Sequence, residues 1–231
     1  MRLDKMLANS GVGSRKDIKN MVKSGVVTVN GEIAKKSDIH INENTDKICV
    51  NGVPVEYKEF IYLMLNKPAG YVSATEDFKY PTVIDLVPEQ YRHYDLFPVG
   101  RLDIDTEGLL ILTNDGAYAH NVLSPKKHVY KTYYAELDIP ATESDVKAFA
   151  DGITIEGGYT CKEAELTISD GEKPAAFVKI CEGKFHQVKL MFNAVGKNVT
   201  YLKRIKFGEF DLPDDLPLGE LTEIYIKGER K

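Results

Sequence analysis

The sequence predicts an α+β fold in two parts: a small N-terminal module, residues 1–57, and a larger domain, residues 58–231. Residues 1–57 contain two short helical patterns and two hairpin patterns, which is enough for a small module. From residue 58 onward, apolar runs of strand length alternate with amphipathic helical patterns, so a mixed sheet with helices is expected. A length of 231 residues fits one small and one medium domain.

Local patterns define the elements of the small module. An i, i+3, i+4 apolar stripe that begins at Leu3 predicts a short helix. Ser14 and Asp17 have the spacing of a capping box and predict the start of a second helix. Residues 26–34 and 48–55 each hold two β-favouring runs joined by Asn-Gly, which predicts two hairpins.

Periodicity also orders the elements of the larger domain. Continuous apolar runs bounded by turn residues predict buried strands, whereas stripes with helical spacing predict amphipathic helices. The predicted strands lie at residues 60–65, 109–112, 199–205 and 221–226. The stretch 126–137 is a basic edge that leads into an aromatic, β-favouring strand, and the stretch 153–180 alternates as in β structure. Helices are predicted at residues 117–123, 143–150 and 183–192, with a short helix or turn at 82–87.

The bulk composition excludes several classes of protein. Cys49, Cys161 and Cys181 are far apart and lack metal-ligand spacing, which argues against a zinc site or a disulfide framework. The sequence shows no signal-peptide pattern and no apolar run of membrane-spanning length. It also shows no phosphate-cradling glycine loop or dinucleotide fingerprint. We therefore expect a soluble, cytoplasmic, monomeric protein that needs no metal and no cofactor and has no membrane partner.

Basic residues gather on one predicted helix face. Arg15, Lys19 and Lys23 recur every four residues and are joined by Lys16, although the whole chain carries a net charge of −5. Most charged helix faces are only solvated. This face carries only positive charges and has no acidic residue at i, i+4 to neutralise them, which favours contact with nucleic-acid phosphates.

The stretch at residues 98–116, PVGRLDIDTEGLLILTNDG, contains candidate reactive groups. Asp103 and Asp105 lie on the loop that precedes an apolar strand, where a rigid scaffold can hold a carboxylate in a cleft. Arg101 could keep Asp103 ionised or bind an anionic substrate.

Other interpretations of this stretch remain open from the residues alone. Asp and Thr before a strand often only cap a turn. A phosphatase-like D-x-D-x-T site fails because its fifth position is Glu107. A glycosidase pair of Asp103 and Asp105 requires a carboxylate separation that sequence spacing does not establish.

The small module resembles the RNA-binding module named after ribosomal protein S4. The matching residues are RLDK at 2–5, SR at 14–15 and VTVNG at 27–31. This module occurs in several unrelated RNA-modifying and ribosome-associated proteins. The resemblance therefore implies the class of target and not the reaction.

Nearly the whole chain is similar to the RsuA family of small-subunit ribosomal RNA pseudouridine synthases. The matching motifs are MLNKPxGYV at 64–72, GRLDIDTxGL at 100–109, KTY at 131–133 and EGxxHQVKxMF at 182–192, where x marks a position outside the match. The resemblance implies an α+β fold whose catalytic domain has a mixed, largely antiparallel sheet. It also implies an isomerase that acts on ribosomal RNA, or on a ribosome assembly intermediate, without a cofactor.

The resemblance implies roles for three residues. Asp103 would be the essential carboxylate, which either attacks C1′ of the uridine as a nucleophile or removes the C2′ proton to give a glycal. Lys189 would pair with Asp103 and fix its rotamer. Tyr133 would stack on the target base once the uridine has left its stack. From the residues alone, Lys189 could be a surface lysine and Tyr133 a core aromatic.

Several further residues are predicted to contact RNA. They are Arg101, Lys131, Lys184, His186 and Gln187 in the larger domain, and Arg2, Arg15, Lys16, Lys19 and Lys23 in the small module. His186 and Gln187 could instead support a loop. Leu190 departs from the family pattern, in which a basic residue commonly follows the matched lysine, and this departure removes one phosphate contact.

The predicted function is isomerisation of one uridine in small-subunit (16S) ribosomal RNA. Lys189 favours this target, because the large-subunit branch of the superfamily is expected to have arginine there. A large-subunit enzyme and a non-catalytic RNA-binding or ribosome assembly factor are the alternatives.

Overall fold

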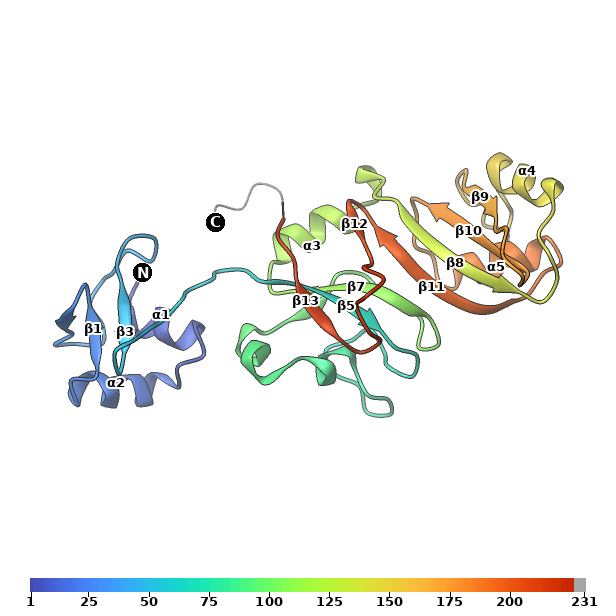
Figure 1. Cartoon of the computed structure of the whole chain (residues 1–231). Coiled ribbons are helices and arrows are strands. Elements are labelled where there is room, and N and C mark those ends of the chain that lie inside the picture. The colour runs from blue at the N-terminus through green and yellow to red at the C-terminus, as the bar shows by residue number, and fades with distance from the viewer. Residues whose placement is uncertain (227–231) are drawn as a thin grey trace. The chain divides into compact units, whose positions relative to one another are not determined.

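The computed structural model describes residues 1–226, and these fold as two compact units. The smaller unit comprises Met1–Ile61 and Pro88–Asp95, and the larger comprises Tyr62–Val87 and the described chain from Leu96 onward. Figure 1 labels most of the helices and strands of both units. None of the helices within residues 1–226 is long and apolar enough to cross a membrane.

The smaller unit packs two helices against a four-stranded sheet. Its elements are α1 (Leu3–Asn9), α2 (Arg15–Lys23), β1 (Val27–Val29), β2 (Glu32–Ile33), β3 (Ile48–Val50) and β4 (Val53–Pro54), with the 3-10 helix η2 (Glu89–Tyr94), and the strand order is β2-β1-β3-β4. The apolar stripe that begins at Leu3 is buried against the apolar residues of α2, with Leu3 and Ile18 fully inaccessible. The predicted two helices and two hairpins are confirmed.

Local hydrogen bonds and turns fix the ends of these elements. The Ser14 side chain accepts a hydrogen bond from the backbone N–H of Asp17, and the Asp17 carboxylate accepts one from the backbone N–H of Ser14. This reciprocal capping box satisfies donors that the first helical turn leaves free. Both hairpin turns have Asn-Gly pairs with positive φ, as a primed turn requires.

The larger unit is built on a nine-stranded sheet. Its strands are β5 (Tyr62–Lys67), β6 (Phe97–Pro98), β7 (Glu107–Thr113), β8 (Lys131–Leu137), β9 (Glu165–Ile168), β10 (Ala175–Ile180), β11 (Val199–Phe207), β12 (Phe210–Asp211) and β13 (Leu221–Glu223). The order is β13-β5-β7-β11-β8-β10-β9, with β6 beside β7 and β12 beside β11. Among the described pairs, β7 with β11 is parallel and the others are antiparallel. The predicted α+β fold with a largely antiparallel sheet is confirmed.

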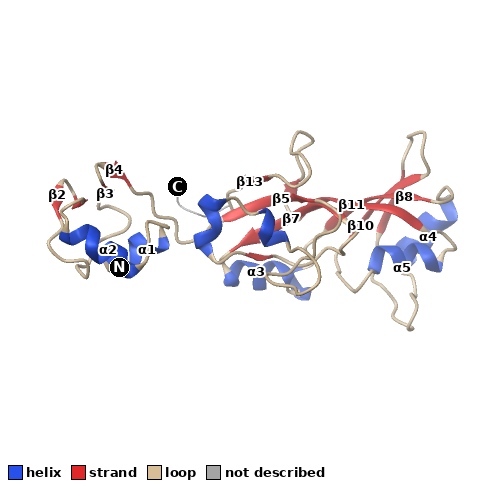
Figure 2. Ribbon diagram, turned by 90° about the horizontal axis from the view of Figure 1, so that it is seen from below, coloured by secondary structure: helices blue, strands red, loops and turns tan. Residues whose placement is uncertain are grey.

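Helices cover the sheet unevenly. They are α3 (Gly116–Leu123), α4 (Glu143–Asp151) and α5 (Gln187–Ala194), with the 3-10 helices η1 (Val83–Leu86) and η3 (Pro125–Lys127). Strands β5 and β7 are apolar and buried on both faces, whereas β8 and β10 bury alternate residues. Figure 2 shows α4 and α5 together on one side of β8 and β10, and the rings of Phe149 and Phe192 join these two helices with centroids 5.0 Å apart.

Some predicted elements of the larger domain are wrong in extent. The strand predicted at residues 221–226 ends at Glu223. The helix predicted at residues 183–192 begins only at Gln187, because His186 has a left-handed backbone (φ 50°) and the side chain of Gln187 accepts a hydrogen bond from the backbone of Lys184. The stretch predicted to be β-like from 153 to 180 contains only β9, β10 and an isolated bridge between Thr154 and Thr160.

The parallel pair of β7 and β11 depends on one glycine. Gly108 is the partner of Arg204 in this ladder, and its φ is +101°. A Cβ at Gly108 would collide with the backbone oxygen and nitrogen of Arg204. Only glycine allows the two strands to approach so closely.

The substitution Gly108→Ala should destabilise the larger unit by about 3 kcal/mol or more, because it combines a backbone collision with a strained φ. Gly116→Ala is the matched control, since Gly116 opens α3 and no heavy atom lies within 4 Å of its Cβ position. We expect Gly116→Ala to change stability by less than about 1 kcal/mol. Urea unfolding followed by circular dichroism measures both, and equal effects would contradict the close-approach argument.

Candidate active site

Two carboxylates and a lysine meet beside β7. Asp103 and Asp105 lie on the loop before β7, and Lys189 lies in the first turn of α5. The Lys189 Nζ is 3.3 Å from Oδ2 of Asp103 and 2.6 Å from Oδ1 of Asp105. The side chain of Asp103 is 26% exposed and that of Asp105 is 67% exposed. Asp103 is therefore the more sheltered carboxylate, although the shorter ion pair belongs to Asp105.

His186 completes the surroundings of Asp103. Its Nε2 lies 3.6 Å from Oδ1 of Asp103, on the carboxylate oxygen that Lys189 does not approach. The imidazole contributes a positive charge there only when it is protonated. The structure thus brings together three of the predicted site residues, Asp103, His186 and Lys189, from segments more than 80 positions apart in the chain.

Asp105 has an electrostatic environment of its own. Partial burial would raise the pKa of its carboxyl, but the hydrogen bond and the positive charge of Lys189 outweigh burial and lower the pKa below its usual value. Asp105 therefore stays ionised and holds the Lys189 ammonium at the mouth of the site. In this position Asp105 can orient the lysine toward Asp103.

The backbone of the Asp103 loop is held by a buried lysine that the sequence analysis did not assign to the site. Lys67, the last residue of β5, has no exposed surface. Its Nζ donates to the carbonyl oxygens of Asp103 (3.1 Å), Ile104 (3.4 Å) and Thr106 (2.8 Å), and also to that of Pro68 (3.0 Å). One ammonium group thereby closes the loop that carries Asp103 onto the end of β5.

The segment after β5 adds two more contacts to the same loop. The backbone N–H of Gly70 donates to the carbonyl of Ile104 at 2.7 Å. The Ser73 hydroxyl donates to the carbonyl of Leu102 and accepts from its N–H. Because these hydrogen bonds fall on both sides of Asp103, the loop has little freedom to move its carboxylate.

Burial also changes the acid–base behaviour of Lys67. Loss of solvent lowers the pKa of its ammonium group to about 8, and the neighbouring carboxylates of Asp105, Glu107 and Asp103 only partly oppose this effect. The sequence does contain a signal, because Lys67 follows the uninterrupted apolar run of β5, where a lysine needs internal partners.

Tyr133 and Arg204 lie beside each other in the sheet. Tyr133 on β8 is 7% exposed, and its partner across the ladder is Arg204 on β11. Arg204 is 2% exposed, donates from Nε to the carbonyl of Leu109 and lies 4.9 Å from the ring of Phe207. Its Nη2 has no hydrogen-bond partner among residues 1–226. Arg204 was not singled out from the sequence, where it sits in a basic stretch between two lysines.

Two of the predicted RNA-contacting residues have their polar atoms engaged inside the unit. The Lys131 Nζ donates to the carbonyls of Val129 and Glu182, and burial lowers the pKa of this lysine, with Arg204 adding to the effect. Gln187 is 4% exposed and donates to the carboxylate of Glu182. These contacts give Lys131 and Gln187 a supporting position around residues 182–187.

The remaining predicted contacts are on surfaces. Arg101 and Lys184 are exposed in the larger unit. In the smaller unit Arg2 is exposed but forms a 2.6 Å ion pair with Asp4, which occupies part of its guanidinium. The basic residues of α2 are all exposed, and none takes part in the ion pairs found within residues 1–226: Arg15, Lys16, Lys19 and Lys23.

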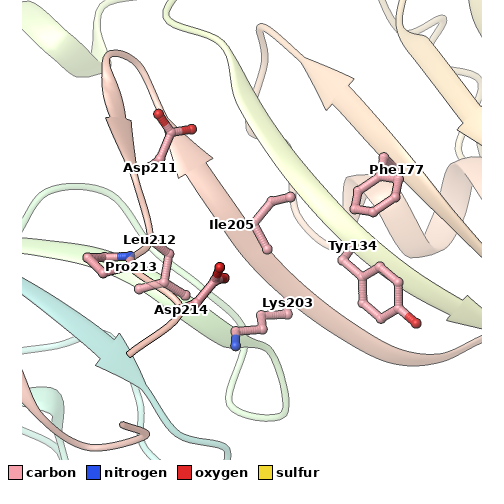
Figure 3. Close-up of a pocket in the computed structure, with 8 residues that line it drawn as sticks. All are labelled: Tyr134, Phe177, Lys203, Ile205, Asp211, Leu212, Pro213 and Asp214. Carbon is pink, nitrogen blue, oxygen red and sulfur yellow. The ribbon is translucent and has the colours of Figure 1, made fainter. Parts of the chain in front are cut away.

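A cavity of about 470 Å³ lies on the other face of the sheet. Its walls include Tyr134, Phe177 and Lys203, which Figure 3 labels. The ring centroids of Tyr134 and Phe177 are 5.5 Å apart. Successive strand residues face opposite sides. Tyr134 therefore points away from the face that Tyr133 occupies, and none of the predicted catalytic residues lines this cavity. Within residues 1–226, no three His, Cys, Asp or Glu side chains are placed to hold one metal ion.

Comparison with known proteins gives two family matches. Residues 61–194 match the family described as RNA pseudouridylate synthase, and residues 1–47 match the S4 domain. A crystal structure of a pseudouridylate synthase is similar over 97% of this chain and 96% of that one, with a TM-score of 0.67 and 36% sequence identity.

Three curated relatives span almost the whole chain. An uncharacterized RNA pseudouridine synthase of Bacillus subtilis is 49% identical over 226 residues, covering 97% of this chain and 95% of its own length. The ribosomal small subunit pseudouridine synthase A of Yersinia pestis is 40% identical, with coverages of 95% and 93%. The ribosomal large subunit pseudouridine synthase B of Bacillus subtilis is 36% identical, with coverages of 96% and 91%.

The substitution Lys67→Met should destabilise the larger unit by about 2 kcal/mol or more, because several loop carbonyls lose their donor. The difference in unfolding free energy between the wild type and the variant should also depend on pH. Between the folded pKa of about 8 and the unfolded value of 10.5, the unfolded wild type binds more protons at Lys67 than the folded protein. Wild-type stability should therefore rise relative to the variant by on the order of 1 kcal/mol per pH unit.

Urea unfolding of both proteins at pH 7, 8, 9 and 10 measures this difference. A wild-type minus variant difference that stays constant across the series would contradict the lowered pKa of Lys67.

Proposed function

The chain belongs to the RNA pseudouridylate synthase family, and on this premise we propose that it isomerises one specific uridine of small-subunit (16S) ribosomal RNA, with Asp103 as the catalytic carboxylate. Membership makes the protein an RNA pseudouridine synthase, an isomerase, and the S4 domain implies RNA binding. The observation that carries the assignment of Asp103 is its carboxylate, held between Lys189 and His186 on an anchored loop.

The reaction breaks the bond between C1′ and N1 of uridine, turns the base and joins C1′ to C5. No atom is gained or lost, so the proposed mechanism uses side chains alone. Asp103 acts at the sugar either as a nucleophile on C1′ or as a base on the C2′ proton. In both routes, Lys189 and His186 hold the carboxylate in place, and the ammonium of Lys189 balances its charge.

Tyr133 is proposed to hold the target base. A uridine held in its stack cannot be turned on its sugar and must be extruded, and an aromatic face suits an extruded base. The low exposure of Tyr133 restricts such contact to a base that has entered the site. We also propose that the Tyr133 hydroxyl assists removal of the C5 proton after the new C1′–C5 bond has formed.

The choice of small-subunit RNA rests on Lys189 in the HQVK motif. The large-subunit branch is expected to have arginine at this position. The named relatives include both a small-subunit and a large-subunit enzyme. They share pseudouridine synthesis but differ in the ribosomal subunit that they modify. A large-subunit target is therefore the second candidate.

The smaller unit is proposed to supply phosphate contacts through the unpaired cations of α2 and through Arg2, and the larger unit through Arg101 and Lys184. We propose a boundary between the two domains at residues 57 and 58, after the last strand of the four-stranded sheet and before β5. Phosphate contacts of this kind position RNA without reading its sequence.

The substitution Asp103→Asn should abolish the conversion of uridine to pseudouridine, because the amide keeps the shape of the carboxylate but is neither a nucleophile nor a base. Asp105→Asn should lose at most about 100-fold in kcat, because Asp105 only orients Lys189. Nucleoside chromatography of digested small-subunit RNA, after incubation with each purified variant, measures the product. Conversion by Asp103→Asn at the wild-type rate would refute the assignment.

Replacing Arg15, Lys16, Lys19 and Lys23 by Gln should weaken RNA binding and reduce its salt dependence. For single-stranded contacts the slope of log K against log salt should fall by about 0.7 for each lost phosphate contact, or by up to about 3 in total. The control is Lys173→Gln with Lys179→Gln, since these lysines are exposed but already paired with Glu136 and Glu165. An unchanged slope in the α2 variant would remove this helix from the RNA-binding surface.

A further inference from the structure

An exposed aromatic ring lies at the edge of the site and has no role in the mechanism above. Phe185 is 78% exposed, and its ring is stacked on that of His186 with centroids 3.7 Å apart and planes 20° from parallel. Single exposed apolar residues are common on proteins and need no explanation by themselves. Phe185 differs because one face of its ring is covered by His186 while most of its surface remains open to solvent.

The turn that carries this ring pair is fixed by hydrogen bonds. The backbone N–H of Lys184 donates to Oε1 of Gln187, and the backbone N–H of Gln187 donates to the carbonyl of Lys184. The side chain of Gln187 also donates to Glu182 at 2.9 Å. His186 takes its left-handed conformation within this closed turn. The stacked pair is therefore organised before any ligand binds, which lowers the entropic cost of binding one.

The ring pair is also next to the candidate catalytic group. His186 contacts Asp103 through Nε2 at 3.6 Å, and Phe185 stacks on the same imidazole. Phe185 is thus two contacts away from the carboxylate and is far more exposed than Asp103. The exposed Lys184 precedes it and adds a positive charge suited to a phosphate.

We propose that Phe185 is a binding residue that stacks on an unpaired nucleobase directly adjacent to the target uridine. When the uridine leaves its stack to reach Asp103, the neighbouring base loses a stacking partner and exposes its π-face. Phe185 replaces that partner, backed by His186, and so stabilises the extruded state. This inference rests on the proposed function, and it adds a subsite for a flanking nucleotide.

The first test compares Phe185→Leu, which removes the aromatic face, with Phe185→Tyr, which restores it. The Phe185→Leu variant should have a KM for an RNA fragment containing the target uridine that is raised by roughly tenfold or more, with little change in kcat. The Phe185→Tyr variant should keep the wild-type KM. Phe177→Leu is the control, because this ring lies on the opposite face of the sheet. A wild-type KM for Phe185→Leu in an active enzyme would overturn the inference and leave the proposed function intact.

The second test observes stacking directly. The chain contains no tryptophan, so Phe185→Trp in an Asp103→Asn background provides a single indole fluorophore at this position. Binding of the RNA fragment should quench its fluorescence, and fragments with an abasic nucleotide on either side of the uridine should show which flank is responsible. Bound RNA without quenching, or quenching that survives both abasic changes, would overturn the subsite. Absence of RNA binding by the wild-type protein would instead refute the proposed function together with the inference.

Discussion

The buried ammonium group of Lys67 is the interaction on which the geometry of the site depends. A charged lysine without exposed surface is costly, and only several well-placed acceptors make it tolerable. Here the acceptors are backbone carbonyls of the loop that carries Asp103, 36 to 39 positions further along the chain. Burying the cation at the end of β5 therefore requires the loop that supplies its acceptors to be in place. A loop held through its backbone leaves the carboxylate of Asp103 free for chemistry.

The charged and aromatic groups around Asp103 have a common origin in the turn before α5. The left-handed residue His186 ends that turn and directs its imidazole toward Asp103, and Lys189 follows one helical turn later toward both carboxylates. The same turn places Phe185 on the outer side of the imidazole. Gln187 and Glu182 close the turn from inside, so these two residues affect the site through its shape. Two segments then define the site: a loop fixed by Lys67 and a helix start fixed by Gln187.

Local patterns in the sequence predicted much of the fold, because the physics that sets them is local. The capping box of Ser14 and Asp17 and the Asn-Gly turns form as expected, since each involves neighbours in the chain. The start of α5 was predicted too early, because the turn that displaces it depends on Glu182 as well as on the helix itself. The parallel pairing of β7 with β11 leaves no periodic signal. Lys67 escaped notice as a site residue because all but one of its acceptors lie far away in the sequence. The grouping of Asp103 with Lys189 came from the family resemblance and not from spacing.

The central claim is that this chain, through Asp103, converts one uridine of small-subunit ribosomal RNA. Mapping of pseudouridine in ribosomal RNA from cells that lack the protein, complemented with wild type or with Asp103→Asn, tests it most directly. The account predicts that a single small-subunit pseudouridine disappears and returns only with the wild-type chain. If a large-subunit pseudouridine disappears instead, and returns only with the wild-type chain, Asp103 keeps its role and the substrate is large-subunit RNA. An unchanged map, or full restoration by Asp103→Asn, would contradict the claim.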